Sequence, residues 1–301
     1  MLVFTNSLIV LILKFMRFKN IENKNTFRFF NYKWKKVPSW GIQTERIYRK
    51  WYLKRYGFKS QVDLKKFLKN KKILEAGCGL ARDSKFFREL SKNSSIYACD
   101  QSDIALKNSK KIHKNLNINF FKQDITKKFE EKDFDLISCD QVLHHTPNPG
   151  SVLKNFNKIL NKNGYLFIFV CAKKNIYRDF CDDFLMSYFS KKSPDKLWSF
   201  AKECTKFAKT LYNLKSKKIN FKGKKYKNIQ EYIHYNLFRF WYNPSIPFNL
   251  SVSSNYDWFS NNPRYSQLQI LNIIKKNLKG YKILNYYKDD ASISFKLQKY
   301  I

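Results

Sequence analysis

Glycine is scarce in this sequence, with only eight glycines among 301 residues. Two of them, Gly77 and Gly79, nevertheless stand within three residues of each other. Glycine adopts backbone conformations that strain other residues, and it lets other groups approach the main chain closely. The pair therefore indicates a tight turn selected for its backbone geometry.

Cysteine pairs with the spacing of zinc ligands are absent. The chain has six cysteines, and no two of them form a Cys-x-x-Cys pair. We therefore expect no metal site. Cys99, Cys139 and Cys171 each follow an apolar run, where a thiol behaves as a small buried hydrophobic group. Unpaired thiols are typical of the cytosol, so we expect a cytoplasmic protein, with a membrane-peripheral position as the alternative.

Long hydrophobic runs are also missing. The most apolar segment, residues 2–13, is about a dozen residues long, which is short of the roughly 20 needed to cross a bilayer. It has no basic stretch before it and no cleavage site of small residues, unlike a signal peptide. We expect no transmembrane span. Residues 1–20 are interpreted as an extension from an upstream start codon, with an interfacial anchor or a packed helix as alternatives.

Arginine is scarce beside lysine, with 10 Arg and 49 Lys in a chain of formal net charge +36. Such a charge is typical of proteins that bind nucleic acids or anionic membranes. Phosphate-binding surfaces, however, rely on arginine and on clustered charge, whereas these lysines are spread along the chain. Compositional bias is the favoured explanation, and RNA remains an alternative partner.

Residues 71–171 alternate between strand-like and helix-like patterns. The apolar runs "KILEAG", "SIYACD", "FDLISCD" and "YLFIFV" are separated by segments of helical periodicity. This alternation predicts a parallel sheet with helices on both faces. After a helix over residues 264–278, two further strands flank the short turn "KDDA" and must run antiparallel. We predict an α/β fold with a Rossmann-like doubly wound sheet, mostly parallel, that closes in a C-terminal antiparallel hairpin.

Four parts are expected along the chain. They are an N-terminal extension and helical segment over residues 1–70, the α/β core over residues 71–171, a helical, aromatic insertion over residues 172–263, and a closing helix and hairpin over residues 264–301. The insertion shows no clear strand pattern and is a candidate acceptor pocket or lid. Its aromatic residues could line that pocket or form a core of their own: Trp241, Tyr242, Tyr256, Trp258 and Phe259.

The residues that follow the predicted strands carry the chemical information, because ligands of open α/β sheets bind beyond the carboxyl ends of the strands. Asp100 follows the second strand, where a carboxylate can accept two hydrogen bonds from a ribose diol. A dinucleotide site would have a third glycine at position 82, where Arg82 stands. The pattern therefore favours a cofactor that has a diol and no pyrophosphate.

The motifs "ILEAGCGLA", "YACDQS", "KQDI" and "DLISCDQVLHHTPNP" resemble the successive motifs of class I S-adenosylmethionine-dependent methyltransferases, of the broad group sometimes called type 11. The resemblance covers residues 71–171. The segment "WYNPSIPFNLSVSSNYDWFSNNPRY" and the terminal hairpin further resemble a bacterial subgroup with an aromatic helical insertion. The resemblance implies that S-adenosylmethionine is the cofactor and that its methyl group is transferred by in-line displacement.

The resemblance also implies a set of cofactor-binding residues: Glu75, Gly77, Gly79, Asp100, Gln101, Asp124, Ile125, Asp140 and Gln141. Glu75 would orient the methionine portion, and the two glycines would admit that portion against the backbone. Leu80-Ala81 departs from the family pattern, because another small residue is usual there, and this crowds the loop slightly.

The other strand ends complete the implied site. Asp100 would bind the ribose hydroxyls, and Gln101 would flank the adenine. Asp124 would accept a hydrogen bond from the adenine amino group while Ile125 packs on the ring. The residues after the fourth strand would face the methionine end and the methyl group, and these are Asp140 and Gln141.

His144 and His145 are the candidate catalytic residues, because an imidazole can act as a general base near neutral pH. A loop role that orders the following helix is the alternative, and His144 is the stronger candidate because it lies nearer the strand end. The expected acceptor is a small molecule, a sugar or a lipid-like compound. An RNA methyltransferase and a non-catalytic protein that binds the cofactor are the alternatives, and the oligomeric state is left open.

Overall fold

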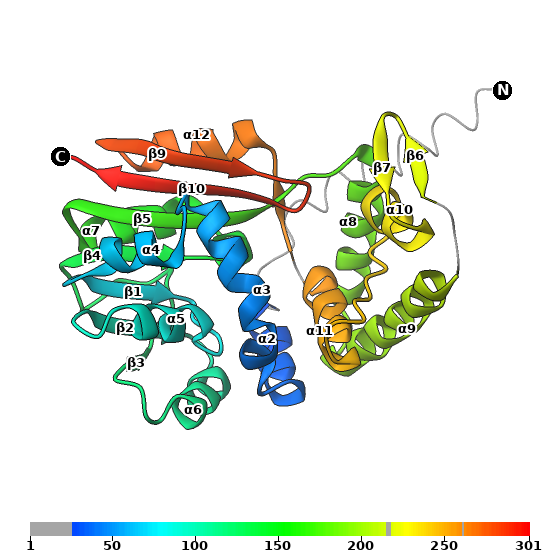
Figure 1. The fold of residues 1–301 in the computed structure, drawn as a ribbon, viewed down its shortest axis with the longest axis horizontal. Coiled ribbons are helices and arrows are strands. Elements are labelled where there is room, and N and C mark those ends of the chain that lie inside the picture. The colour runs from blue at the N-terminus through cyan, green and yellow to red at the C-terminus, as the bar shows by residue number, and fades with distance from the viewer. Residues whose placement is uncertain (1–25, 215–217, 261) are drawn as a thin grey trace.

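The computed structural model describes residues 26–214, 218–260 and 262–301 (Figure 1). The interpretations of residues 1–20, and of the apolar segment within them, lie outside these residues. Over the described part of the chain, none of the helices combines the length and the apolar character that crossing a bilayer requires.

One mixed sheet forms the larger part of the fold. Among the described residues it has eight strands, in the order β3-β2-β1-β4-β5-β10-β9, and β8 pairs with β5. The strands are β1 (Lys72–Ala76), β2 (Ser95–Asp100), β3 (Asn119–Lys122), β4 (Phe134–Cys139), β5 (Leu160–Ala172), β8 (Arg264–Tyr265), β9 (Tyr281–Lys288) and β10 (Ser292–Lys299). β1 to β5 run parallel, and β10 is antiparallel to both β5 and β9. The predicted fold class, including the C-terminal hairpin, is confirmed.

Helices cover both faces of this sheet. The helices of the α/β part are α4 (Gln61–Leu68), α5 (Arg82–Leu90), α6 (Asp103–Ile112), α7 (Pro149–Ile159) and α12 (Gln267–Asn277), with the short 3-10 helix η3 (Leu143–His145). Neighbouring residues of β1 point to opposite faces: Leu74 packs in the core that α7 and α12 complete, and Ile73 in the core that α4 and α5 complete.

Local capping explains where several helices begin. The Ser102 hydroxyl accepts a hydrogen bond from the backbone N–H of Ala105 and so caps the start of α6. Asn148 caps α7 in the same way, and Pro149 occupies its first turn, where a missing N–H costs nothing. Ser266 forms a capping box with Gln269 at the start of α12.

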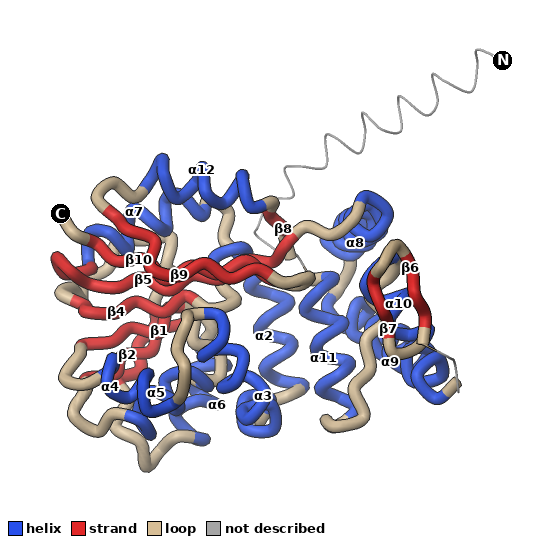
Figure 2. Tube along the Cα trace, turned by 45° about the horizontal axis from the view of Figure 1, so that its top comes forward, coloured by secondary structure: helices blue, strands red, loops and turns tan. Residues whose placement is uncertain are grey.

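The remaining helices stand beside the sheet (Figure 1), except that the one with Tyr52 also packs on one face of it. They are α2 (Thr26–Lys36), α3 (Trp40–Arg55), α8 (Ile176–Ser190), α9 (Pro194–Asn213), α10 (Ile229–Asn236) and α11 (Phe248–Phe259). α2 and α11 lie side by side (Figure 2), and the Tyr256 hydroxyl donates to the backbone oxygen of Phe29 at 2.9 Å. α2 therefore contacts the insertion directly.

A short hairpin interrupts the helical insertion, although its sequence shows no strand pattern. β6 (Ile219–Phe221) and β7 (Lys224–Tyr226) pair antiparallel. The two residues between them, Lys222 and Gly223, both have positive φ, as the tightest hairpin turns require. Most of the hairpin is exposed and carries lysines, so no apolar alternation marks it in the sequence.

Candidate functional site

The carboxyl ends of the parallel strands open into a cavity of about 1330 Å³. Every residue predicted to bind the cofactor or to act in catalysis lines it: Glu75, Gly77, Gly79, Asp100, Gln101, Asp124, Ile125, Asp140, Gln141, His144 and His145. Residues of α2, α3 and the helical insertion form the opposite wall. The fold thus brings together residues that four separate motifs contribute.

The glycine turn after β1 is fixed by backbone geometry. Gly77 and Gly79 have φ of +77° and +52°, values that other residues rarely adopt. A Cβ at Gly77 would overlap the side chain of Val142, and a Cβ at Gly79 would lie 2.9 Å from Trp34 Cζ2. Both glycines are therefore required by the turn and by the side chains packed over it. Ala81 also has a positive φ, of 53°, a conformation that is strained for a residue with a Cβ.

Asp100 is held at the cavity wall by two backbone hydrogen bonds. The N–H of Gly79 donates to Oδ2 at 2.9 Å, and the N–H of Ser102 donates to Oδ1 at 2.8 Å. Burial raises the pKa of the carboxyl, and these backbone donors oppose that shift. A carboxylate has about four lone-pair sites, so each oxygen keeps capacity for a further donor such as a ribose hydroxyl.

Glu75 is 6% exposed and accepts two hydrogen bonds on Oε2, from the backbone N–H and the hydroxyl of Ser84. Burial, followed by the neighbouring charge of Asp83, raises the pKa of the Glu75 carboxyl to about 8. The group thus anchors the first turn of α5 and lines the cavity at the same time. A cation beside it would favour its ionised form.

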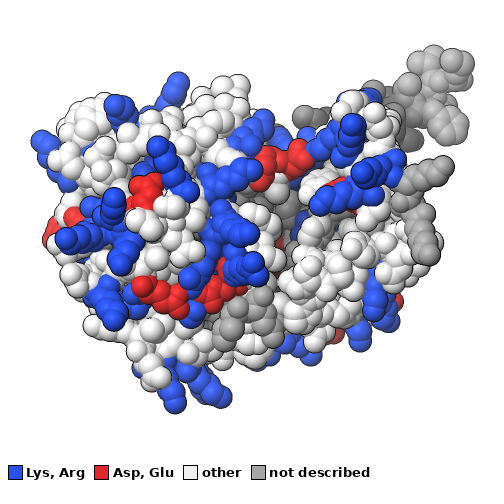
Figure 3. Space-filling view, in the orientation of Figure 1, with Lys and Arg blue, Asp and Glu red and all other residues white. Residues whose placement is uncertain are grey.

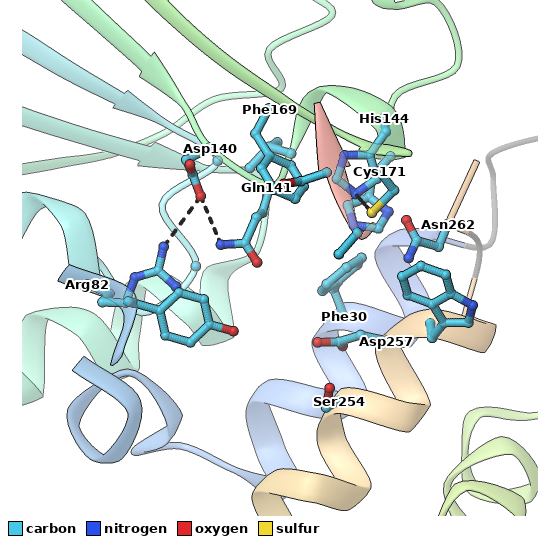
Figure 4. Close-up of a pocket in the computed structure, with 18 of the residues that line it drawn as sticks. Phe30, Arg82, Asp140, Gln141, His144, Phe169, Cys171, Ser254, Asp257 and Asn262 are labelled. Atoms are coloured by element: carbon cyan, nitrogen blue, oxygen red, sulfur yellow. Dashed lines mark hydrogen bonds and ion pairs between the residues drawn. The ribbon is translucent and has the colours of Figure 1, made fainter. Parts of the chain in front are cut away.

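Asp140 joins the end of β4 to the N-terminal helices. Its Oδ2 accepts from the Tyr56 hydroxyl at 2.8 Å, and Oδ1 accepts from Arg55 Nη1 at 3.1 Å and from the Gln141 side-chain amide at 2.8 Å. Arg82 Nη2 lies 3.7 Å from the same Oδ1. Figure 4 shows Asp140 between Arg82 and Gln141. The carboxylate therefore orients Gln141, which has a φ of +63°.

The third strand end supplies a capped turn. Asp124 Oδ1 accepts from the backbone N–H and the hydroxyl of Thr126, at 2.9 and 2.7 Å. Ile125, at 6% exposure, belongs to the sheet core and also lines the cavity. Gln101 is exposed on the same wall. These side chains provide an apolar surface bordered by hydrogen-bonding groups.

The two histidines occupy different surroundings within η3. His144 is 2% exposed, its Nε2 lies 3.6 Å from Cys171 Sγ, and burial lowers its pKa well below the ordinary value. The ring of His145 meets Phe30 edge-on at 4.8 Å between centroids. His144 is therefore neutral at pH 7, and both rings face the cavity.

The α2 and α3 residues of the wall were not predicted from the sequence. Phe30, Lys33 and Trp34 of α2, with Trp40 and Tyr48 of α3, all line the cavity. Lys33, which is 3% exposed, pairs with Asp257 of α11. One sequence pattern could have identified these residues: the spacing of Phe30, Lys33 and Trp34 places their side chains on one face of a helix.

The insertion contributes both aromatic and cationic residues. Of its five candidate aromatics, Trp241 and Trp258 line the cavity, whereas Tyr256 and Phe259 pack in the core of the insertion. Tyr242 packs edge-on against Tyr212. The sequence did not single out the cations Lys174 and Arg239 of the same wall, nor His234.

Comparison with known proteins places this chain in a family. Residues 67–233, more than half of the chain, match the profile of the family described as "Methyltransferase domain". The ubiquinone biosynthesis O-methyltransferase of Coxiella burnetii (strain RSA 493 / Nine Mile phase I) is 34% identical over 106 residues, which cover 33% of this chain and 43% of that protein. The protein of the same name from Pasteurella multocida is 30% identical over 114 residues, covering 33% and 46%. The matches thus span less than half the length of these relatives.

Among solved structures, a SAM-dependent methyltransferase from Aquifex aeolicus matches with a TM-score of 0.44 and 14% identity over 78% of this chain and 86% of that one. Magnesium protoporphyrin IX methyltransferase from Synechocystis, solved with bound SAM, has a TM-score of 0.44 and 12% identity over 86% and 80%. Because the family profile spans more than half of the chain, the protein belongs to the methyltransferase-domain family, as its resemblance to class I methyltransferases predicts.

Proposed function

We propose that the protein transfers a methyl group from S-adenosylmethionine to a small-molecule acceptor. The observation that carries the proposal is the convergence of Glu75, Asp100, Asp124 and Asp140, from four strand ends, on one cavity. Membership of the methyltransferase-domain family supports it. The cavity, at about 1330 Å³, exceeds the ~300–1,000 Å³ of common ligand pockets, and so has room for a cofactor together with an acceptor.

The residues present fit the cofactor. Asp100, fixed by Gly79 and Ser102, would accept hydrogen bonds from the ribose diol. Glu75 would pair with the amino group of the methionine portion, and Asp124 with Ile125 would hold the adenine. The positive φ of both glycines sets the turn on which the first of these contacts depends.

When bound, the cofactor supplies an electrophilic methyl group on a sulfonium. The chain's own contribution is alignment, because correct orientation of the two reactants removes much of the barrier to a bimolecular step. Gln141, whose amide Asp140 orients, is placed to position the reacting groups. The leaving thioether needs no proton, so a base is needed only for an acceptor that starts out protonated. His144 and His145 are the proposed bases for that case.

The acceptor would enter from the side of the helical insertion. Trp241 and Trp258 of that part line the cavity together with Phe30 of α2, and aromatic walls suit small organic ligands. Two of the curated relatives are named for ubiquinone biosynthesis, and their acceptors are small molecules. This likeness supports an acceptor of the same size class.

RNA methylation is the competing function, and the net charge of +36 is the observation in its favour. On the face drawn in Figure 3, Lys and Arg side chains stand over the sheet and the helical part alike, and Asp and Glu side chains lie among them. Several phosphate contacts would give RNA binding a steep dependence on salt. A shallow dependence would leave the small-molecule acceptor as the better explanation.

The test is product formation with a labelled methyl donor. The purified protein is incubated with S-adenosylmethionine labelled in its methyl group and with either a small-molecule extract or total RNA. We expect S-adenosylhomocysteine to form only with the extract, and mass spectrometry to find a product heavier by one CH₂ group. Label found only in RNA would support RNA methylation instead. No turnover with either fraction would reject both proposed functions.

A further inference from the structure

Three cationic side chains surround one indole ring in the wall that the insertion contributes. Arg239 Cζ lies 4.8 Å, Arg178 Cζ 5.4 Å and Lys174 Nζ 5.7 Å from the centroid of the Trp258 ring. All four residues line the cavity. Lys174 and Arg178 flank the start of α8, whereas Arg239 follows α10, so the fold brings Arg239 to the other two.

Several donors of this cluster have no partner among the described residues. They are Lys174 Nζ, both Nη1 and Nη2 of Arg178, Arg239 Nε and Trp258 Nε1, each shielded from solvent. Arg178 as a whole is 1% exposed. Leaving a buried donor unpaired destabilises the fold, and more so when the donor is charged. A cluster of such donors around one cavity wall is therefore built to receive acceptor atoms.

The nearby acids do not neutralise the cluster. Asp182 accepts from Arg178 Nε at 3.0 and 2.9 Å, but it also lies 3.6 Å from Arg264 Nη1. The remaining carboxylates of this wall have other cations or their own loop as partners: Asp179 and Asp183 pair with Arg264, Asp257 with Lys33, Asp290 with Lys224, and Asp289 with the backbone around Ser292. Among the described residues Lys174 and Arg239 thus make no direct ion pair, and Arg178 pairs through Nε, which leaves its Nη1 and Nη2 without a partner.

The pKa values of these groups reflect their burial and the closeness of the cations to one another. Burial, together with the charges of Arg178 and Arg239, lowers the pKa of Lys174 to about 8. Burial, and then the charge of Arg178, lowers the pKa of Arg239 to about 10. Each cation is destabilised by its neighbours, and a bound anion would relieve that repulsion.

We infer that Arg178, Lys174 and Arg239 bind an oxyanion, a carboxylate or a phosphate, carried by the methyl acceptor. The inference rests on the proposed function and narrows its substrate class to anionic small molecules. Guanidinium groups present paired donors that match the oxygens of either anion, and the indole N–H of Trp258 adds a further donor. Cys171 lines the same cavity and lies beside the candidate base, with its Sγ 3.6 Å from His144 Nε2.

Calorimetric titration with inorganic phosphate and with benzoate tests the inference, at constant ionic strength set with chloride. The variants are Lys174→Gln and Arg239→Gln, and Lys173→Gln is the control, because Lys173 is the exposed neighbour in sequence. We expect one site per chain for at least one of the two anions. Each cluster variant should weaken that binding roughly tenfold, the loss of about one charge-assisted hydrogen bond, and the control should leave it unchanged.

The anion that binds more tightly names the group on the acceptor. Failure of both anions to bind, or equal binding by all four proteins, would overturn the inference. Lys174→Gln removes no hydrogen bond made within the described residues, so its folding should be unaffected, and a thermal melt verifies this. The same preparations are titrated with S-adenosylmethionine: cofactor binding without anion binding refutes this inference alone, whereas anion binding without cofactor binding refutes the proposed function and leaves the anion site standing.

Discussion

The hydroxyl of Tyr56 donates a hydrogen bond to Asp140 Oδ2 at 2.8 Å. This contact joins the end of α3 to the end of β4, and the ion pair from Arg55 to the same carboxylate reinforces it. Arg55 at the end of α3 and Tyr56 directly after it both precede the part of the chain that matches the family profile, which begins at residue 67. The N-terminal helices are therefore a structural component of the site.

Replacing Tyr56 by Phe removes the hydroxyl and leaves the ring in place. Because the bond ends on a buried carboxylate, we expect the free energy of unfolding to fall by about 1.5–3 kcal/mol. Equilibrium unfolding in urea measures the change. Tyr300→Phe is the control, since Tyr300 is 54% exposed, and it should change stability by less than about 0.5 kcal/mol. Equal stability of the two variants would contradict the role given to Tyr56.

Removing the carboxylate should cost more than removing the hydroxyl. Asp140→Ala leaves the Arg55 guanidinium, whose residue is 4% exposed, without its ion pair. Loss of one partner of a buried pair costs about 3–5 kcal/mol. The same urea titration measures this loss of stability. A loss no larger than that of Tyr56→Phe would show that the ion pair with Arg55 contributes little to stability.

The glycine turn can be tested by a paired substitution. Gly77→Ala places a Cβ against Val142 at a position of positive φ, so we expect lower stability and weaker binding of S-adenosylmethionine. Adding Val142→Ala removes the steric part and should restore part of both losses, while the backbone strain of about 1 kcal/mol remains. Additive losses in the double variant would show that Val142 is not what excludes a side chain at position 77.

The raised pKa of Glu75 predicts proton release on cofactor binding. With a pKa of about 8, the free protein holds this carboxyl largely protonated at pH 7. A cationic amino group beside it favours the carboxylate, so affinity should rise as pH increases from 6 to 8 and level off above. Calorimetry in buffers of different ionisation enthalpy counts the released proton. Glu75→Gln should bind S-adenosylmethionine without releasing this proton. If that variant released as many protons as wild type, the pairing of Glu75 with the cofactor's amino group would be contradicted.

The Glu75 carboxyl should also make the stability of the fold depend on pH, in the direction opposite to that of cofactor affinity. A folded-state pKa raised above the unfolded value stabilises the fold at low pH, and this contribution is lost as pH rises through the folded-state pKa. The contribution of Glu75 to the free energy of unfolding should therefore fall between about pH 4.5 and 8. Comparison of wild type with Glu75→Gln in urea, at several pH values, isolates this dependence.

A base role for His144 predicts a loss of rate without a loss of cofactor affinity. If His144 takes the acceptor's proton, His144→Gln should lower kcat by about 10²–10⁴-fold. Because burial lowers the pKa of His144 well below the ordinary value, wild-type kcat should not depend on pH above about 6.5. A kcat within twofold of wild type would leave the role to His145 or to no base, and His145→Gln separates those cases.

The strand-end residues could be predicted because each belongs to a short local motif, and a parallel sheet brings strand ends to one edge. Asp100 and Glu75 could be predicted without knowing any contact between residues distant in sequence. Lys33 could not be found in this way, because its partner Asp257 lies far along the chain in another helix. Lys174 and Arg239 likewise meet only around Trp258. Their positions depend on how the insertion packs, and no local pattern encodes that.

The central claim is that the cavity binds S-adenosylmethionine through Asp100. Titration calorimetry with S-adenosylmethionine tests it directly, on wild type, Asp100→Ala and the control Asp103→Ala, whose side chain is exposed nearby on α6. We predict one-to-one binding by wild type and the control, and affinity at least about tenfold weaker for Asp100→Ala, the loss of hydrogen bonds to a charged acceptor. Absence of binding by wild type, or equal affinity of all three proteins, would contradict the claim.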